Sequence, residues 1–363
     1  MTQEPVLVNG RFLSQPVTGV QRFSAEIVDA IDTLIGMGEW PETALLTPQL
    51  AGAPAGLAGA RGSRLRVRPV GRRQGHLWEQ IDLPRAARGS TLINLGNTAP
   101  VLAGAGQVVV IHDAGVFDTP SSYSWKFRLA YKGLQQALAK AGARIATVSE
   151  FSRRRIAACL DIDAEQIAVL YEGADHILRT AADPHTLARY GLRPGGFALV
   201  VGSRVAHKNL AALEEVTAAL GRRGMVVAVA GGTNAVVFRA TPGAVGERQL
   251  GRITDAELRA LYENACCLLF PSRYEGFGLP PVEAMACGCP VIAGQGGAVE
   301  EICGGTALYF DADQPGSIAR AVERLLDDAD LAADLRVRGI GRAATLSWIA
   351  SARILGDVVR RAS

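Results

Sequence analysis

Short runs of apolar residues alternate with segments of helical spacing along the whole chain. Runs such as "QVVVIHD", "FALVVG" and "MVVAVAGG" are continuous and are bounded by Gly or Asp. Such runs are typical of strands that are buried on both faces of a parallel sheet. Between the runs, apolar residues recur at helical spacing, as in the stripe formed by Val20, Phe23, Ile27, Ile31 and Leu34. This alternation predicts an α/β fold with doubly wound sheets.

The chain is too long for one core of ordinary size. It has 363 residues, and single cores stop growing well below that length. The segment "ADHILRTAADPHTLARYGLRPGG", residues 174–196, separates two sets of predicted strands. We therefore expect one Rossmann-like domain over residues 1–175 and a second over residues 195–345. Sheets of this class bind ligands at the carboxyl ends of their strands, which predicts a cleft between the two domains.

Composition and cysteine usage favour a soluble globular protein of the cytoplasm. Apolar residues make up 48% of the chain and charged residues 20%. The six cysteines form no C-x-x-C pair, which favours buried reduced thiols. No apolar stretch reaches the roughly 18 residues that span a bilayer, and the segment "MTQEPVLVNGRF" lacks the pattern of a secretion signal.

Positive charge is unevenly distributed, although the net charge is only +3. Residues 43–132 contain eleven Arg or Lys and four Asp or Glu, and "RGSRLRVRPVGRR" alone contains six arginines. This basic segment, Arg61 to Arg73, is either a solvated face or a contact for an anionic membrane surface or an anionic lipid-linked substrate. Nucleic acid is disfavoured as a partner, because no aromatic interleaving or known binding motif accompanies the arginines.

Two glutamates flank a loop rich in glycine and proline within the segment "FPSRYEGFGLPPVEAMACGCPVIAG". "CLLFPS" predicts a buried strand, and "PPVEAMACG" predicts a short helix with Pro281 and Glu283 in its first turn. A helix N-terminus favours an anion, and Gly276 and Gly278 let backbone amides approach it closely. Carboxylates such as Glu275 and Glu283 beside an anion site suit a ligand with hydroxyls on both sides of a phosphate. A nucleotide-sugar is such a ligand.

The string "EGFGLPPVEAMACGCPVIA" closely resembles the E-x7-E motif of the family 4 retaining glycosyltransferases, which have the GT-B fold. The resemblance spans almost the full chain. It implies two Rossmann-like domains that face each other across a cleft, with the acceptor in the first domain and the nucleotide donor in the second. It also implies that the last helix, within residues 346–363, crosses back onto the first domain.

The resemblance implies roles for particular residues. "VGSRVAHKNL" matches the family's basic loop, in which Arg204 and Lys208 would bind the donor diphosphate and stabilise the leaving group. Glu275 would hold hydroxyls of the donor sugar and Glu283 those of the ribose, while His112 would lie near the donor sugar or the acceptor. The implied catalytic residues are Glu275, His112, Lys208 and Arg204. The other implied donor contacts are Gly19, Ile253 and the backbone of Gly276, Phe277, Gly278 and Leu279.

The implied activity is that of a retaining hexosyltransferase, which moves a sugar from a nucleotide-diphosphate donor to a glycan or lipid-linked acceptor. The resemblance favours surface-polysaccharide biosynthesis, including that of lipopolysaccharide, with GDP-mannose or a UDP-sugar as donor. The reaction would take place in the cytoplasm or on the inner face of the membrane, without a further cofactor. A sugar-nucleotide epimerase or hydrolase on the same fold is the alternative. The basic first half argues against it, because an anionic lipid-linked acceptor would explain that charge.

Two D-x-D strings are candidate metal sites, "DID" at 161–163 and "DAD" at 311–313. The first precedes "AEQIAVLY" and is typical of a turn or helix cap, whereas the second ends the predicted strand "ALYF". We therefore expect catalysis without a metal ion.

Overall fold

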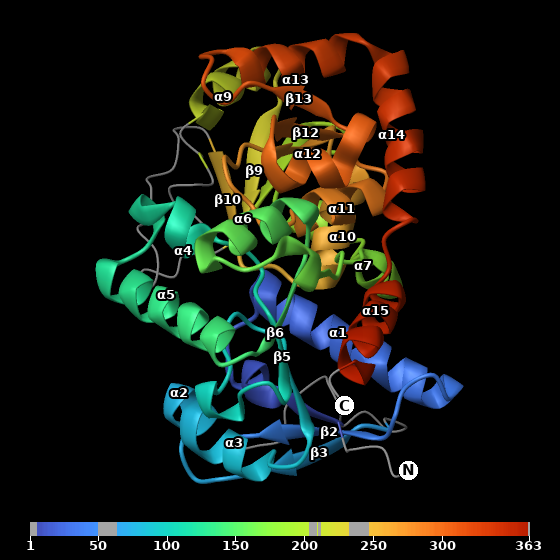
Figure 1. Cartoon of the computed structure of the whole chain (residues 1–363). Coiled ribbons are helices and arrows are strands. Elements are labelled where there is room, and N and C mark those ends of the chain that lie inside the picture. Colours follow the sequence, from blue (N-terminus) through green and yellow to red (C-terminus); the bar gives the residue numbers. More distant parts are fainter. Residues whose placement is uncertain (1–5, 50–63, 203–208, 210–211, 232–246, 362–363) are drawn as a thin grey trace. The chain divides into compact units, whose positions relative to one another are not determined.

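The chain folds into two compact units. The structure, a computed structural model, describes residues 6–49, 64–202, 209, 212–231 and 247–361. The first unit consists of Met1–Ala114, Leu129–Glu172 and Trp348–Ser363, and the second of Gly115–Arg128 and Gly173–Ser347. Both units are α/β, as the alternation of apolar runs and helical segments predicts (Figure 1).

A parallel sheet forms the centre of the first unit. Its seven described strands run in the order β3-β2-β1-β4-β5-β6-β7, with all neighbours parallel. The strands are β1 (Val6–Asn9), β2 (Thr43–Thr47), β3 (Arg66–Pro69), β4 (Thr91–Asn94), β5 (Gln107–Val110), β6 (Arg144–Thr147) and β7 (Ala168–Val169). The central strands β1, β4 and β5 are buried along their whole length, because helices and loops cover both faces.

The first unit has long helices and several short ones. The α-helices are α1 (Gly19–Met37), α2 (Gly75–Leu77), α3 (Leu83–Ala86), α5 (Trp125–Lys140), α6 (Glu150–Leu160) and α15 (Trp348–Arg360), with α5 beginning in residues that group with the second unit. Short 3-10 turns lie at Gly10–Ser14, Val101–Ala103 and Ala164–Gln166, and a π-helical turn, η2, lies at Trp78–Asp82.

Helices α1 and α15 lie side by side, although they are far apart in the sequence (Figure 1). Of the predicted apolar stripe of α1, Val20 is half-buried and the other four residues are buried. The helix ends at Gly38, whose φ of +75° suits glycine. Trp348 at the start of α15 is 1% exposed, and its ring meets the edge of Phe23 with centroids 5.8 Å apart. Apolar packing therefore joins the last helix to the first helix of this unit.

A second parallel sheet forms the centre of the second unit. Its six described strands run in the order β10-β9-β8-β11-β12-β13, again with parallel neighbours. The strands are β8 (Phe197–Val201), β9 (Val226–Ala230), β10 (Glu247–Gly251), β11 (Cys267–Phe270), β12 (Val291–Gly294) and β13 (Leu308–Phe310). The helices are α4 (Gly115–Asp118), α7 (Asp175–Arg179), α8 (Thr186–Arg189), α9 (Leu213–Arg222), α10 (Asp255–Asn264), α11 (Leu279–Ala286), α12 (Gly297–Cys303), α13 (Ser317–Asp327) and α14 (Ala329–Ala343). 3-10 turns lie at Pro120–Ser122 and Gly304–Thr306.

The strand order of each sheet reverses at its first strand. In the first sheet the order reverses between β1 and β4, and in the second between β8 and β11. Ligands of doubly wound sheets bind outside the carboxyl ends of the strands at such a switch point. Each unit therefore has one edge at which a ligand site is expected.

The segment Gly115–Arg128 departs from the predicted division of the chain, in which residues 1–175 formed one continuous domain. It groups with the second unit, although the residues before and after it group with the first. A hydrogen bond accounts for part of this grouping, because Tyr274 Oη donates to Asp118 Oδ2 at 3.1 Å. Tyr274 directly precedes Glu275 in the glycine-rich loop.

Candidate functional site

The loop with the two glutamates lies at the switch point of the second sheet. Strand β11, which is wholly buried, pairs with β8 on one side and β12 on the other. The loop leaves the carboxyl end of β11 and leads into α11, as the sequence predicts. It therefore occupies the position at which sheets of this class bind their ligands.

Helix α11 begins one residue earlier than the segment "PPVEAMACG" predicts. It starts at Leu279 after Gly278, whose φ of +104° is unfavourable for other residues. A side chain there would also approach Val299 Cγ2 to 3.2 Å, so this position requires glycine. Because of the earlier start, Glu283 lies beyond the first helical turn, and the expectation that it lies in that turn is wrong. Pro280 and Pro281 have no N–H, so Leu279 is the only one of the first three residues of α11 whose amide could donate to an anion.

The loop combines a half-buried carboxylate with buried apolar side chains. Glu275 and Gly276 are half-buried, whereas Phe277 is 3% exposed and Leu279 is 8% exposed. Phe277 and Leu279 therefore fix the loop against the core of the unit. Glu275 stays accessible next to the N-terminus of α11.

Glu283 lies deeper than Glu275 and is bound by two side chains of the same unit. It is 5% exposed. Its Oε1 lies 2.8 Å from Nε2 of His176 in α7, and its Oε2 accepts a hydrogen bond from Tyr262 Oη in α10 at 2.9 Å. Burial, and next the charge of Glu283, raise the pKa of Tyr262 well above its ordinary value. The hydroxyl therefore stays protonated and donates to the carboxylate.

His176 and Tyr262 are functional candidates that the sequence analysis missed. His176 lies in the segment that was interpreted as a domain boundary, and Tyr262 lies on the buried face of a helix. Together the two side chains fix the position of the Glu283 carboxylate.

We expect Tyr262→Phe to lower the free energy of unfolding by about 1–3 kcal/mol, because a buried carboxylate oxygen would lose its hydrogen-bond donor. Chemical denaturation followed by circular dichroism would measure the change. Tyr190→Phe is the matched control. Tyr190 Oη also donates to a carboxylate, Glu257 Oε1 at 3.2 Å, but Thr254 and Arg189 contact that carboxylate as well. Tyr190→Phe should lower the free energy of unfolding by less than about 1 kcal/mol. An equal decrease in both variants would contradict this prediction.

A further predicted donor contact of the second unit lies on another loop. Ile253 follows β10 and is half-buried. The next residue, Thr254, caps α10, because its Oγ1 accepts from Glu257 N at 3.2 Å. Arg204 and Lys208, which the sequence analysis assigned to the donor diphosphate, lie outside the described residues.

The predicted residues of the first unit, His112 and Gly19, have contrasting surroundings. His112 is 5% exposed, its Nε2 donates to the carbonyl of Leu95 at 2.9 Å, and its Nδ1 lies 3.8 Å from Glu172 Oε1. Its ring also meets the edge of Phe23, with centroids 4.7 Å apart. Gly19 is exposed at the start of α1, and a side chain there would meet no atom within 4 Å.

Residues 194–342 match the family model of the glycosyl transferases group 1. O-antigen chain mannosyltransferase B of Escherichia coli is 31% identical over 255 residues, which cover 66% of this chain and 66% of that relative. The second unit of the chain, which contains residues 194–342, belongs to the group 1 glycosyltransferases. O-antigen chain mannosyltransferase RfbU of Salmonella typhimurium is 27% identical over 237 residues, which cover 63% of each chain. The chain thus spans slightly less than two thirds of the length of either relative.

Solved structures with the same fold include three proteins of low sequence identity. HepE of Anabaena, in complex with UDP and glucose, has a TM-score of 0.74 at 15% identity and is matched over 99% of this chain and 100% of its own. Sucrose-phosphate synthase of Thermosynechococcus elongatus has a TM-score of 0.72 at 17% identity over 99% of both chains. WaaG, a glycosyltransferase involved in lipopolysaccharide biosynthesis, has a TM-score of 0.68 at 14% identity over 98% of this chain and 99% of its own. The predicted GT-B fold is confirmed.

Both D-x-D strings of the chain have structural roles. Asp161 ends α6 in the left-handed conformation, and Asp163 accepts from the amide of Glu165 at 3.0 Å as a cap. Asp313 forms an ion pair with Arg273. Among the residues that the structure describes, no group of three His, Cys, Asp or Glu side chains is placed to hold a metal ion. No helix in this part of the chain has the length and apolar character needed to cross a bilayer.

Proposed function

We propose that the protein is a retaining glycosyltransferase that moves mannose from a nucleotide-diphosphate donor to a glycan or lipid-linked acceptor in surface-polysaccharide biosynthesis. The observation that carries this proposal is the position of Glu275 at the switch point of a group 1 glycosyltransferase unit. Its E. coli and Salmonella relatives are described as O-antigen chain mannosyltransferases, which supports mannose as the sugar. None of the relatives named above is described as a sugar-nucleotide epimerase or hydrolase.

The donor diphosphate is proposed to bind at the N-terminus of α11. The backbone of Gly276, Phe277, Gly278 and Leu279 would face it, and Arg204 and Lys208 would add positive charge. Stabilisation of charge on the leaving group is the main requirement of this reaction. Excess chelator is therefore expected to leave activity unchanged.

The hydroxyls of the donor are assigned to the two glutamates. Glu275 would hold the sugar and orient its ring. Glu283 would hold the ribose, and Ile253 would lie along the base. In the first unit, Gly19 would face the diphosphate and His112 would be near the sugar or the acceptor.

Nucleotide binding and donor turnover test this proposal. Isothermal titration calorimetry with GDP, UDP and ADP should detect one nucleoside diphosphate that binds, and the matching nucleotide-sugar should serve as donor. Transfer should then require an acceptor such as octyl α-mannoside. Rapid conversion of the donor by pure protein without any acceptor would favour the epimerase or hydrolase instead. No binding of any of these nucleotides would contradict a glycosyltransferase function.

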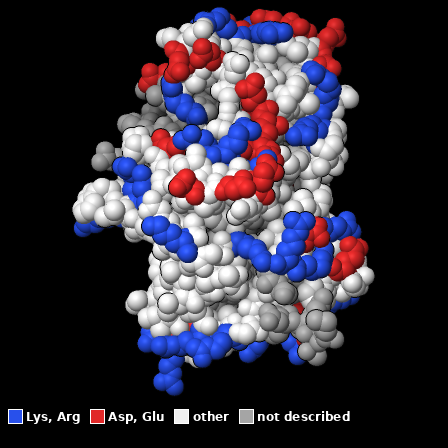
Figure 2. Space-filling view, viewed as in Figure 1, with Lys and Arg blue, Asp and Glu red and all other residues white. Residues whose placement is uncertain are grey.

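The proposed acceptor and membrane contact rest on the basic segment Arg61–Arg73. Arg66, Arg68 and Arg72 are exposed, and Figure 2 shows Lys and Arg gathered over the part of the first unit that holds β3 and α3. Arg61 lies outside the described residues. We place the reaction in the cytoplasm, on the inner face of the membrane, where an anionic surface would attract this segment at about 1 kcal/mol per charge.

The protein is expected to sediment with anionic vesicles at low salt and to be released by about 0.5 M salt, because screening shortens the reach of surface charges to a few ångströms. A triple change of Arg66, Arg68 and Arg72 to Ser should weaken sedimentation severalfold and leave nucleotide affinity unchanged. Arg73 is kept, because it pairs with the buried Asp82 at 2.6 Å. A wild-type protein that ignores anionic vesicles at low salt would contradict the membrane contact.

A further inference from the structure

A buried polar network lies at the switch point of the first sheet. Asn9 ends β1 and Asn94 ends β4, the two strands between which the strand order reverses. Asn9 Nδ2 donates to Asn94 Oδ1 at 3.0 Å and to Glu79 Oε1 at 2.9 Å. Glu79 belongs to the π-helical turn η2 and is 1% exposed. Such π-helical turns occur frequently at functional sites.

The two oxygens of Glu79 have unequal surroundings. Oε1 accepts three hydrogen bonds, from Asn9, from Arg11 Nε at 3.1 Å and from Thr98 Oγ1 at 3.0 Å. Oε2 is buried and has no hydrogen bond of good geometry, and it faces Nδ1 of His76 at 3.3 Å. Burial by itself would raise the pKa of Glu79, but His76 and the charge of Arg11 lower that pKa overall. Glu79 is therefore an ionised carboxylate with one oxygen directed at an imidazole.

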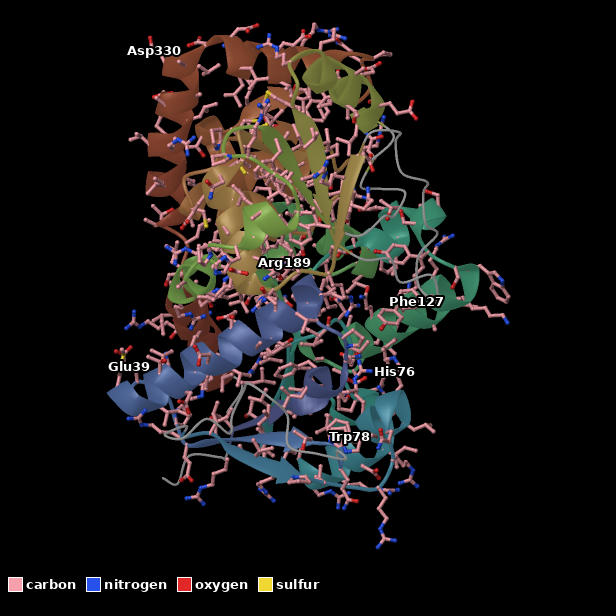
Figure 3. The ribbon with its side chains drawn as sticks, turned by 180° about the vertical axis from the view of Figure 1, so that it is seen from behind. Glu39, His76, Trp78, Phe127, Arg189 and Asp330 are labelled. Atoms are coloured by element: carbon pink, nitrogen blue, oxygen red, sulfur yellow. The ribbon has the colours of Figure 1, made fainter. Side chains whose placement is uncertain are left out.

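His76 joins this buried carboxylate to the surface. Its side chain is 54% exposed, and its ring meets the edge of Tyr131, with centroids 6.2 Å apart. Figure 3 labels His76 and Trp78, which lie two positions apart on the short helical stretch before α3, and Trp78 is fully buried. A carboxylate at Nδ1 holds the proton on that nitrogen, so that Nε2 of the neutral ring is an acceptor. Nε2 lies on the opposite side of the ring and points away from Glu79.

We propose that Nε2 of His76, oriented by Glu79, accepts a hydrogen bond from a hydroxyl of the saccharide acceptor. This inference rests on the proposed function, and it places a binding site for the acceptor of that reaction in the first unit. The three hydrogen bonds to Glu79 Oε1 already hold the buried network together. The contact between Oε2 and the half-exposed His76 is therefore not needed for packing. An aromatic ring, here Tyr131, beside a few fixed polar groups is typical of a site for a small ligand.

The first test uses the donor and octyl glycoside pair that the wild type turns over. His76→Ala should raise KM for the octyl glycoside about tenfold, because one hydrogen bond to the acceptor is lost. KM for the donor and the nucleotide dissociation constant should stay within about twofold of the wild-type values. His185→Ala is the matched control, since His185 is also exposed but lies in the second unit. It should leave all three constants unchanged.

The second test keeps the imidazole and reverses its tautomer. In Glu79→Gln the amide oxygen can still accept from Asn9, Arg11 and Thr98, whereas the amide N–H₂ would face Nδ1. Nδ1 then has to accept, which places the proton on Nε2 and removes the acceptor atom. KM for the octyl glycoside should rise as in His76→Ala, with circular dichroism confirming the fold.

Unchanged KM for the octyl glycoside in His76→Ala would overturn this inference, while transfer by the wild type would still support the proposed function. A wild type that binds no nucleotide and transfers no sugar would overturn both. If Glu79→Gln proves too unstable to assay, His76→Ala remains the deciding variant, because His76 lies at the surface and its truncation leaves the fold intact.

Discussion

Glu275→Ala is expected to lower the rate of sugar transfer about 100-fold, which corresponds to a loss of about 3 kcal/mol of transition-state stabilisation. The carboxylate is half-buried at the carboxyl end of β11, next to the N-terminus of α11. Its proposed contacts with the sugar hydroxyls orient the ring for departure of the diphosphate. Because Phe277 and Leu279 anchor the loop, the variant should remain folded.

Steady-state assays with saturating donor would measure this loss, with the nucleotide dissociation constant as a second readout. The constant should change little, because Glu275 is assigned to the sugar rather than to the nucleotide. Glu263→Ala is the control, since Glu263 is an exposed glutamate of the same unit that pairs with Arg259 on α10. Near-native transfer by Glu275→Ala would remove Glu275 from the proposed active site.

Trp348→Ala is expected to destabilise the first unit by about 3–5 kcal/mol. The indole is 1% exposed and packs against Phe23, which is itself fully buried. Helix α15 also lies close to Trp40, because a side chain at Gly356 would come within 2.9 Å of that ring. Truncation of a buried indole leaves a cavity that neighbouring groups fill only in part.

Urea denaturation followed by far-UV circular dichroism would measure this change without relying on tryptophan fluorescence. Arg353→Ala on the same helix is the control, since it breaks only the exposed ion pair with Glu39 at 2.8 Å. Exposed pairs of this kind contribute about 0–1 kcal/mol. A Trp348→Ala variant as stable as the Arg353→Ala variant would contradict the packing of α15 on α1.

The parallel sheets could be predicted because their central strands are apolar at successive positions, as in "FALVVG", which forms β8. The strand–loop–helix around Glu275 could also be predicted, since Gly278 and the prolines are local signals. The start of α11 was misplaced, because a positive φ at Gly278 is a property of the folded loop.

The partners of the buried carboxylates could not be predicted in the same way. His176 and Glu283 are 107 positions apart, and Asn9 and Glu79 are 70 positions apart. Neither pair carries a local spacing that links its members. The grouping of Gly115–Arg128 with the second unit likewise involves a contact with Tyr274, which is distant in sequence. Such contacts arise only when the helices and strands of a unit are packed together.

The most direct test of the central claim is a proton NMR time course of the wild type with GDP-mannose and octyl α-mannoside. The α-linkage of GDP-mannose should be retained, so that a new α-mannosyl linkage grows as GDP-mannose disappears. A β-linked product would contradict the retaining mechanism. If GDP-mannose and each UDP-sugar tried in its place were only hydrolysed or epimerised, with no disaccharide formed, the protein would not be a glycosyltransferase of the kind proposed.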